Sequence, residues 1–374
     1  MPHRLSLVRR LALLRRMYTG ETDSSLMPVV TAGVQRLSPD DRGRLHEMLD
    51  NDNVGRLFGD DELPPPPTHV RRALLADALT EGQRELESGI FTAAGRAVNY
   101  LHLRVPADLL RPARVFRMVR PHADEMVLHL ESGALGPLLA ELLPRVAGGE
   151  MLGVPGLRAR LHRRHVELYL VDDVSATVHL SNISYRQWVA ALAFAESLVD
   201  LGDLRWLGND PTPLTEAERS VLDTRHRSPG PAALNSSLLR RARIFGDALW
   251  LTPWSRGCET THVEWAGQPS LGRVARLLLH PLLGLPGDGH HVRYFDADGL
   301  VVTDPHAPRC PMHPASTAPV LALRPEPAPD GPLELSSPGW RAAASPWAAW
   351  QRALATTNPA LPKQPAAPTP PINK

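Results

Sequence analysis

LRARLHRRHVELYLV, residues 157–171, is the stretch that indicates the fold most clearly. Apolar and polar residues alternate on both sides of a basic centre, which is the pattern of a β-hairpin with one buried face. The apolar positions are Leu157, Ala159, Leu161, Val166, Leu168 and Leu170. We therefore expect a hairpin within an antiparallel sheet.

The segments around the hairpin carry strand and helix patterns in turn. The patterns predict strands over 114–120, 125–131 and 175–181, helices over 69–88, 134–146 and 184–200, and a loop over 147–156. Helices that gather against one face of an antiparallel sheet define an α+β fold, which is the fold class we expect here.

A later segment repeats part of this pattern. VLHLESGALGPLLAELL, from Val127, and VEWAGQPSLGRVARLLL, from Val263, keep Leu and Gly at the same spacing. LGVPG at 152–156 and LGLPG at 283–287 follow them, and a hairpin pattern follows each. Two duplicated β-α-β-β units would explain the match, and so would chance, because Leu, Gly and Pro are abundant in this chain. A cleft between two similar halves would be a natural ligand or partner site.

Proline-rich and polar stretches divide the chain into parts. The N-terminal part carries helical patterns over 4–18, 24–37 and 38–50. The predicted parts are an N-terminal helical domain over 1–62, a proline linker over 63–67, a first α+β unit over 68–201, a linker with one helix over 202–245, a second α+β unit over 246–325, and a Pro/Ala-rich, largely disordered tail over 326–374 with a short helix near 345–354.

The composition limits the kinds of partner and location. The 374 residues include 41 basic and 40 acidic side chains, so the whole molecule has no strong attraction to nucleic acid or membrane. No apolar run approaches the ~20 residues that span a bilayer, and only two cysteines are present. We expect a cytoplasmic protein without membrane insertion. Because Arg, Ala and Pro dominate, a bacterial genome rich in G and C is the expected source.

Two basic segments are candidate polyanion sites. The polar face of the hairpin carries Arg158, Arg160 and Tyr169, and its turn carries Arg163 and Arg164. A helix over 4–18 places Arg9 and Arg16 opposite an apolar stripe. Such sites could contact nucleic acid, although the solvated face of a sheet and a protein interface explain the hairpin arginines as well.

Histidines and cysteines offer two further candidates. CPMHP, at 310–314, resembles a short metal-binding signature of some heavy-metal transport proteins, which implies His306, Cys310 and His313 as zinc or copper ligands. No cofactor is otherwise expected. An enzyme with dispersed catalytic residues could instead be centred on Cys258, His262, His290 and His291.

The tail carries an aromatic helix pattern. Trp347, Trp350 and Leu354 fall on one side of a short helix, which could dock into a groove of a partner or fold back over the second unit. LTEAERSVL, at 214–222, is similar to the opening of a helix-turn-helix in some bacterial transcription regulators, but the helices that should follow are missing. Its Thr215 and Glu218 predict a capping box.

No motif for a nucleophile, a general acid or base, or a phosphate-binding loop occurs in the sequence. The sequence therefore favours a non-catalytic binding or assembly protein that acts through contacts with an unknown protein partner. The alternatives are a protein associated with nucleic acid and the dispersed-site enzyme.

Overall fold

The computed structural model describes residues 5–50, 66–102, 114–131, 133–173, 175–198, 212–224, 229–256, 259–286, 290–303, 319–326 and 350. Three helices open the chain: α1 (Leu7–Thr19), α2 (Asp23–Gln35) and α3 (Pro39–Asp50). The predicted apolar stripe of α1 is confirmed, because Leu7, Leu11 and Tyr18 are buried. The Oγ atom of Ser38 accepts a hydrogen bond from the backbone of Asp41 at 3.0 Å and so caps α3.

The predicted helix over 69–88 is wrong, because two helices occupy this region. They are α4 (Thr68–Leu74) and α5 (Glu81–His102). The backbone of Leu75 is extended and ends α4, and the hydroxyl of Thr80 accepts a hydrogen bond from the backbone of Gln83 to begin α5. The sequence pattern predicts one helix because the apolar residues of both helices share a compatible helical spacing.

The first sheet is mixed and has the strand order β1-β2-β7-β6-β5. Neighbouring strands are antiparallel except β2 and β7, which are parallel. The strands are β1 (Phe116–Pro121), β2 (Met126–Leu130), β5 (Leu157–Leu161), β6 (His165–Leu170) and β7 (Thr177–Ser181), and the helices are α6 (Leu135–Leu142) and α7 (Tyr185–Leu198). The predicted hairpin is confirmed as β5 and β6, but the sheet is not wholly antiparallel.

A small second hairpin replaces part of a predicted helix and a predicted loop. The helix expected over 134–146 ends at Leu142, and β3 (Arg145–Ala147) pairs with β4 (Glu150–Leu152). Its turn contains Gly148 and Gly149, both with positive φ. Consecutive glycines with positive φ form the tight turn that a two-residue hairpin requires, and the prediction of an unstructured loop overlooked this turn.

The second sheet repeats the connectivity of the first. Its order is β10-β11-β12-β9-β8, and its single parallel pair is β9 and β12. Its elements are β8 (Ala248–Arg256), β9 (Thr260–Gly267), α10 (Leu271–Leu278), β10 (His291–Phe295), β11 (Leu300–Thr303) and β12 (Val320–Glu326). In both sheets the first strand is an edge, a helix follows the second strand, and the fifth strand lies beside the second. The repeated segments found in the sequence correspond to β2–α6 and β9–α10.

In the predicted linker over 202–245, the described residues form two α-helices and not one. They are α8 (Glu216–Thr224) and α9 (Pro229–Arg240), and the short 3-10 helix η2 (Ala242–Phe245) follows. The expectation of a linker with one helix is therefore wrong. The sequence of α9 contains three glycine or proline residues at its start and Asn-Ser-Ser in its middle, which are weak helix formers, so its helix depends on tertiary packing.

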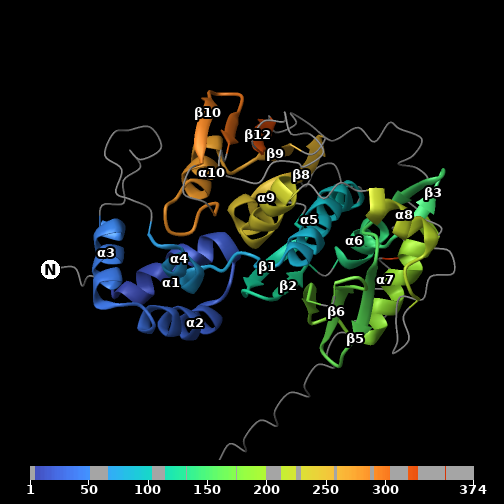
Figure 1. Ribbon diagram of the computed structural model, residues 1–374, viewed down its shortest axis with the longest axis horizontal. Helices are drawn as coiled ribbons and strands as arrows, with labels where there is room; N and C mark the ends of the chain where they lie inside the picture. Colours follow the sequence, from blue (N-terminus) through green and yellow to red (C-terminus); the bar gives the residue numbers. More distant parts are fainter. Residues whose placement is uncertain are drawn as a thin grey trace, which may run out of the picture.

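Helices α5 and α9 lie side by side at the centre of the molecule (Figure 1). Glu87 of α5 accepts hydrogen bonds from the guanidinium group of Arg240 at 2.6 and 2.8 Å and from the hydroxyl of Ser236 at 2.6 Å. All three side chains are buried. A buried ion pair needs such additional partners to offset its desolvation, and here they join the helix before the first sheet to the helix before the second.

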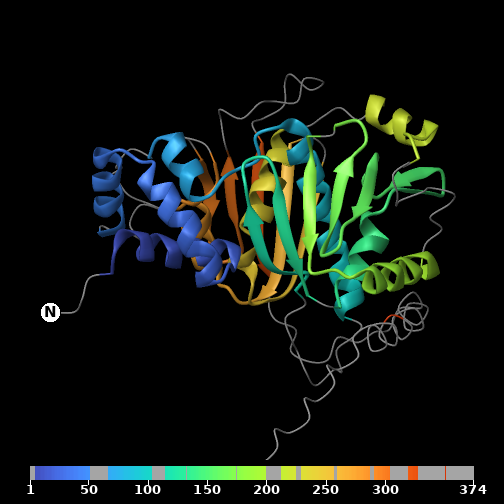
Figure 2. The ribbon, with the colours of Figure 1, turned by 90° about the horizontal axis from the view of Figure 1, so that it is seen from below.

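The N-terminal helices pack beside the second sheet, and the first sheet lies at the other end of the molecule (Figure 2). The hydroxyl of Tyr18 donates to the carbonyl of Leu277 at 2.8 Å, and Arg71 donates to the carbonyls of Gly284 and Leu285. One continuous hydrophobic cluster includes α1, both sheets and α6. The described residues therefore share a single core, in an α+β fold. None of the described helices has the length and apolar character to cross a bilayer.

Candidate functional site

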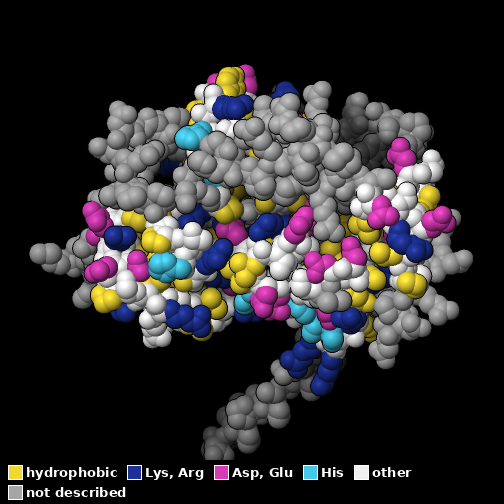
Figure 3. All heavy atoms as spheres, viewed as in Figure 1, with side chains coloured by type: hydrophobic (Ala, Val, Ile, Leu, Met, Phe, Trp, Pro, Cys, Tyr) yellow, Lys and Arg dark blue, Asp and Glu magenta, His cyan; other side chains and the backbone are white. Residues whose placement is uncertain are grey.

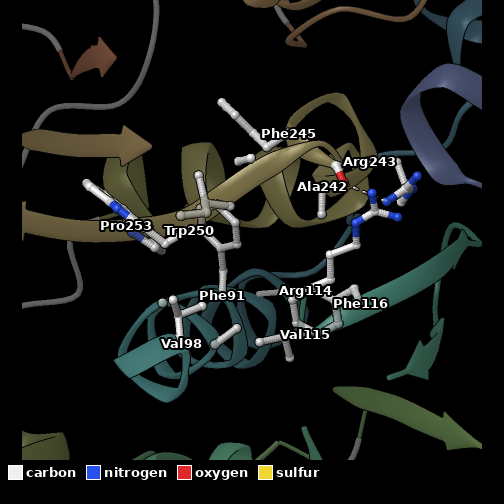
Figure 4. A pocket seen from close by; sticks show the side chains of 15 residues that line it. Phe91, Val98, Arg114, Val115, Phe116, Ala242, Arg243, Phe245, Trp250 and Pro253 are labelled. Atoms are coloured by element: carbon white, nitrogen blue, oxygen red, sulfur yellow. Dashed lines mark hydrogen bonds between the residues drawn. The ribbon is translucent and has the colours of Figure 1, made fainter. Parts of the chain in front are cut away.

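A small pocket of about 50 Å³, partly open to solvent, lies where the two halves of the chain meet (Figure 4). Its walls come from α5 and the start of β1 on one side, and from η2 and β8 on the other. Most of the lining is apolar: Phe91, Ala94, Val98, Val115, Phe116, Ala242, Phe245, Ala248, Trp250, Leu251 and Pro253. The pocket thus joins equivalent regions of the two sheets, because β1 and β8 are the first strands of each.

Small residues allow α5 and β8 to approach each other beside this pocket. A Cβ atom built on Gly95 would lie 2.2 Å from the Cδ atom of Pro253. Proline donates no backbone hydrogen bond, but β8 is an edge strand, where proline is tolerated. Gly95 and Pro253 therefore set the width of the pocket.

Two arginines provide the charged part of the lining. The guanidinium groups of Arg114 and Arg243 lie at the same end of the pocket (Figure 4). Arg114 forms an ion pair with the exposed carboxylate of Asp247 at 3.1 Å, but its Nε atom is buried and has no hydrogen-bond partner among the described residues. Arg243 donates one long hydrogen bond of 3.4 Å to the carbonyl of Gly246, and within the described parts of the chain it forms no ion pair.

The surroundings of Arg243 disfavour its charge. Burial lowers the pKa of Arg243 below the ordinary value for arginine, and the nearby charge of Arg114 lowers it further. The carboxylates of Asp247 and Glu131 oppose this effect. An anion bound at this end of the pocket would favour the charged form of both guanidinium groups.

The position of Arg243 also depends on the N-terminal helices. Its side chain lies across Gly20, which ends α1 with φ of 69°, and a Cβ atom built there would lie 2.8 Å from the Cγ atom of Arg243. The left-handed backbone and the close approach both favour glycine. Three parts of the chain therefore build the charged end of the pocket: α1, the first strand of the first sheet, and η2.

The pocket lining is suited to binding and has few groups for catalysis. Among the described residues that line the pocket, none has an acidic, histidine, cysteine, hydroxyl or lysine side chain that could act as a general base or nucleophile. Across the described part of the chain, no group of three His, Cys, Asp or Glu side chains could hold a metal ion. The arrangement can hold an apolar group and, beside it, an anion.

The hairpin arginines do not share one environment. Arg158 is fully buried and donates two hydrogen bonds to Glu218, at 2.9 and 3.0 Å, and others to the carbonyls of Thr212 and Pro213. Its expected place on a solvated or polyanion-binding face is therefore wrong, because its guanidinium is already satisfied. The sequence pattern could not reveal this, since α8 covers this end of the polar face.

Glu218 has two roles at this point. The predicted capping box is confirmed, because Glu218 and Thr215 exchange hydrogen bonds between side chain and backbone at 3.1 and 2.9 Å. Burial raises the pKa of Glu218, but the hydrogen bonds from Arg158, Thr215 and Gly156 outweigh it, so the net pKa lies below the ordinary value. Glu218 is therefore a stable anion that neutralises Arg158.

The remaining residues of the predicted polyanion sites are more exposed. Arg160 lies over the ring of Tyr169, with 3.9 Å between the guanidinium carbon and the ring centroid, and Tyr169 is only 3 % exposed. Tyr169 cannot stack on a base in this position. Arg163 and Arg164 are exposed at the hairpin turn. Arg9 and Arg16 are exposed on α1, and Arg16 lies 3.4 Å from Asp23.

The residues proposed for metal binding or catalysis do not come together within the described part of the chain. His306, Cys310, His313 and Cys258 lie outside the described residues. His262 of β9 stacks on Trp254, with 3.9 Å between ring centroids, while His291 begins β10 and His290 precedes it. Two strands separate β9 from β10, so the backbones of His262 and His291 are about 14 Å apart across the sheet.

Trp350, the described residue of the predicted tail helix, packs inside the molecule, but not on the expected unit. Trp350 is 1 % exposed, its indole Nε1 donates to the carbonyl of Gly133 at 2.9 Å, and its ring contacts Phe194 of α7. A Cβ atom built on Gly136 would lie 2.7 Å from the Cδ1 atom of Phe194 and 3.2 Å from the Cδ2 atom of Trp350, so glycine makes room for both rings. Trp350 thus covers the first unit and not the second, while Trp347 and Leu354 lie outside the described residues.

No protein-family model, curated protein or solved structure matches the chain. Evidence about the site therefore comes from its geometry. Sequence reasoning missed Arg114 and Arg243, because 128 intervening residues separate them and neither belongs to a motif. The one useful signal was the repeated segment, which pointed to a site between similar halves.

Proposed function

We propose that this protein is a non-catalytic binding protein, and that the pocket between its two sheets holds a small ligand with an apolar body and one anionic group. The observation that carries this proposal is the pair of guanidinium groups at one end of an apolar pocket, one of them with a buried Nε atom that lacks a partner. Buried polar groups are normally hydrogen-bonded, so an unpaired one beside a cavity points to a missing acceptor.

The chemistry of the lining defines the ligand further. Trp250, Phe91 and Phe245 offer aromatic surfaces to a flat or aliphatic group. Arg114 and Arg243 would donate charge-assisted hydrogen bonds to a carboxylate or a similar anion. Neutral molecules of the same shape would leave Arg243 without an anionic partner and would add no anion beside the Nε atom of Arg114, so they should bind more weakly.

Several expectations from the sequence accompany this proposal. A protein partner remains a prediction, but Trp350 is engaged inside the molecule and is not offered to it. A bacterial origin and a cytoplasmic location also remain predictions. The identical strand order of the two sheets supports the proposal that one unit arose by duplication of the other.

The test is isothermal titration calorimetry with three anions, phenylacetate, indole-3-acetate and octanoate, each beside its neutral amide. We expect at least one anion to bind, and its amide to bind at least about tenfold more weakly, because each charge-assisted hydrogen bond contributes about 1.5–3 kcal/mol. Arg243→Gln and Arg114→Gln should each reduce the affinity for the anion, whereas Arg273→Gln, at an exposed site on α10, should not.

Any one of three results would contradict the proposal, the first at the level of binding itself and the other two at the level of its specificity. The first is that none of the three anions binds to the wild-type protein. The second is that acid and amide bind equally well, and the third is that neither pocket arginine affects binding. Circular dichroism of each variant distinguishes a lost contact from a lost fold.

A further inference from the structure

The tip of the β5–β6 hairpin is a basic point on the surface of the first sheet. A hydrogen bond of 2.9 Å from the backbone of His162 to the carbonyl of His165 closes the turn, which leaves Arg163 and Arg164 at its apex. Both are exposed, and neither forms an ion pair with any described residue. Arginine and histidine side chains gather at this end of the molecule (Figure 3).

Three histidine side chains lie close to Arg163 and Arg164. The rings of His162 and His165 are stacked with 4.4 Å between their centroids, and His165 meets His179 of β7 edge-on at 4.9 Å. Stacked imidazoles repel each other when both are protonated, so the cluster is easiest to form when its histidines are neutral. An anion placed against them would favour protonation.

In the described part of the chain, two carboxylates face this cluster. Glu167 accepts hydrogen bonds from Arg160 and pairs with His162, both at 2.9 Å, and Glu125 lies 3.3 Å from His179. Both carboxylates are therefore already engaged, which leaves Arg163 and Arg164 as the free positive charges. Protonation of the histidines would add to this excess.

We propose that this apex, formed by Arg163, Arg164 and the histidines 162, 165 and 179, binds the phosphate backbone of double-stranded nucleic acid, and binds it more tightly as the histidines gain protons. A two-stranded β-ribbon fits the major groove of DNA, and arginines at its tip reach phosphates on either side. The site is separate from the pocket between the sheets and does not depend on the proposed ligand.

The surroundings of the apex favour a duplex over other polyanions. Tyr169, on the strand that leads away from the apex, is buried beneath Arg160, so it cannot stack on the bases of a single strand. A membrane-binding loop usually inserts exposed apolar or aromatic side chains. Residues 162–165 at the turn include no apolar side chain, and the apolar residues next to them, Leu161 and Val166, are partly or fully buried.

The direction of the pH dependence follows from the surroundings of His165. Burial lowers the pKa of His165, and the neighbouring His162 and His179 lower it further, against a smaller effect of Glu167 and Glu125. Free His165 is therefore neutral at neutral pH. A bound phosphate would raise its pKa, so binding takes up protons and becomes tighter as the pH falls through the titration range of histidine.

Fluorescence anisotropy of a labelled DNA duplex of about 20 base pairs, measured with the full chain, tests this proposal. We expect binding at about pH 6 that weakens by at least about tenfold at about pH 7.5, and that also weakens as salt is added. Arg163→Ala with Arg164→Ala should abolish most binding. The control, Arg273→Ala with Arg276→Ala, removes the same charge from the exposed side of α10 and should bind like the wild type.

A second variant, His165→Asn with His179→Asn, should bind more weakly than the wild type at about pH 6 and depend less on pH, because two of the three histidines can no longer gain charge. The absence of duplex binding at about pH 6, or equal binding by the Arg163/Arg164 variant and the wild type, would overturn the proposal. So would binding to vesicles of phosphatidylglycerol and phosphatidylcholine but not to DNA. The Arg163/Arg164 variant should still bind the pocket anion, which separates this test from that of the proposed function.

Discussion

At the scale of single residues, arginine has at least three different roles in this chain. Arg158 and Arg240 are fully buried and paired with Glu218 and Glu87. Arg163 is exposed and without an ion-pair partner among the described residues, whereas Arg243 lies half-buried at the pocket. A sequence in which arginine supplies almost all positive charge does not distinguish these roles, because each depends on which element covers the side chain.

The pair of Arg158 and Glu218 gives a direct prediction at this scale. Glu218→Ala leaves the guanidinium of Arg158 buried without its charge partner and should lower the free energy of unfolding by about 3–5 kcal/mol. Urea denaturation measures this change. Glu216→Ala, at an exposed position of the same helix, is the control and should cost no more than about 1 kcal/mol. Equal effects of the two substitutions would show that the buried pair is not needed for stability.

At the scale of elements, periodicity predicted most strands and helices but not their partners. The hairpin over β5 and β6 followed from alternation, and α1, α2 and α3 followed from helical spacing and capping. The break between α4 and α5 and the helix α9 could not be predicted, because Arg71 and the Glu87–Arg240 pair fix them through contacts with distant segments. Arg114 and Arg243 were unpredictable for the same reason.

Gly95 and Gly43 form a matched test of element packing. Gly→Ala in a helix usually stabilises it by up to about 1 kcal/mol, and Gly43→Ala in α3 should do so, because no atom lies within 4 Å of the built Cβ. Gly95→Ala should instead destabilise the protein by about 1–3 kcal/mol, because the new methyl group collides with Pro253. Thermal unfolding compares both with the wild type. Stabilisation by Gly95→Ala would contradict the close approach of α5 and β8.

At the scale of the whole molecule, the two similar sheets do not stand as independent bodies. The N-terminal helices, both sheets and Trp350 share one hydrophobic cluster, and α5 and α9 are joined by a buried ion pair. The sequence predicted the two units. It also predicted a linker between them, over 202–245, but the structure has the packed helices α8 and α9 in this segment. The pocket exists only because these parts are held together.

This shared core predicts cooperative unfolding. We expect one transition in urea, seen at the same midpoint by circular dichroism and by tryptophan fluorescence, because Trp188 and Trp265 report on different sheets of the same core. Glu87→Ala should lower that midpoint without splitting the transition, since it weakens the contact that both halves share. Two separate transitions in the wild-type protein would contradict a single core.

The most direct test of the central claim, that the pocket between the sheets is a site for an anionic ligand, is a crystal structure with bound 4-bromophenylacetate. The anomalous signal of bromine locates the ligand without ambiguity. We predict the aromatic ring between Trp250 and Phe91, and the carboxylate within hydrogen-bond distance of Arg243 and of the Nε atom of Arg114. An empty pocket at saturating ligand, or a carboxylate directed away from both arginines, would contradict the account.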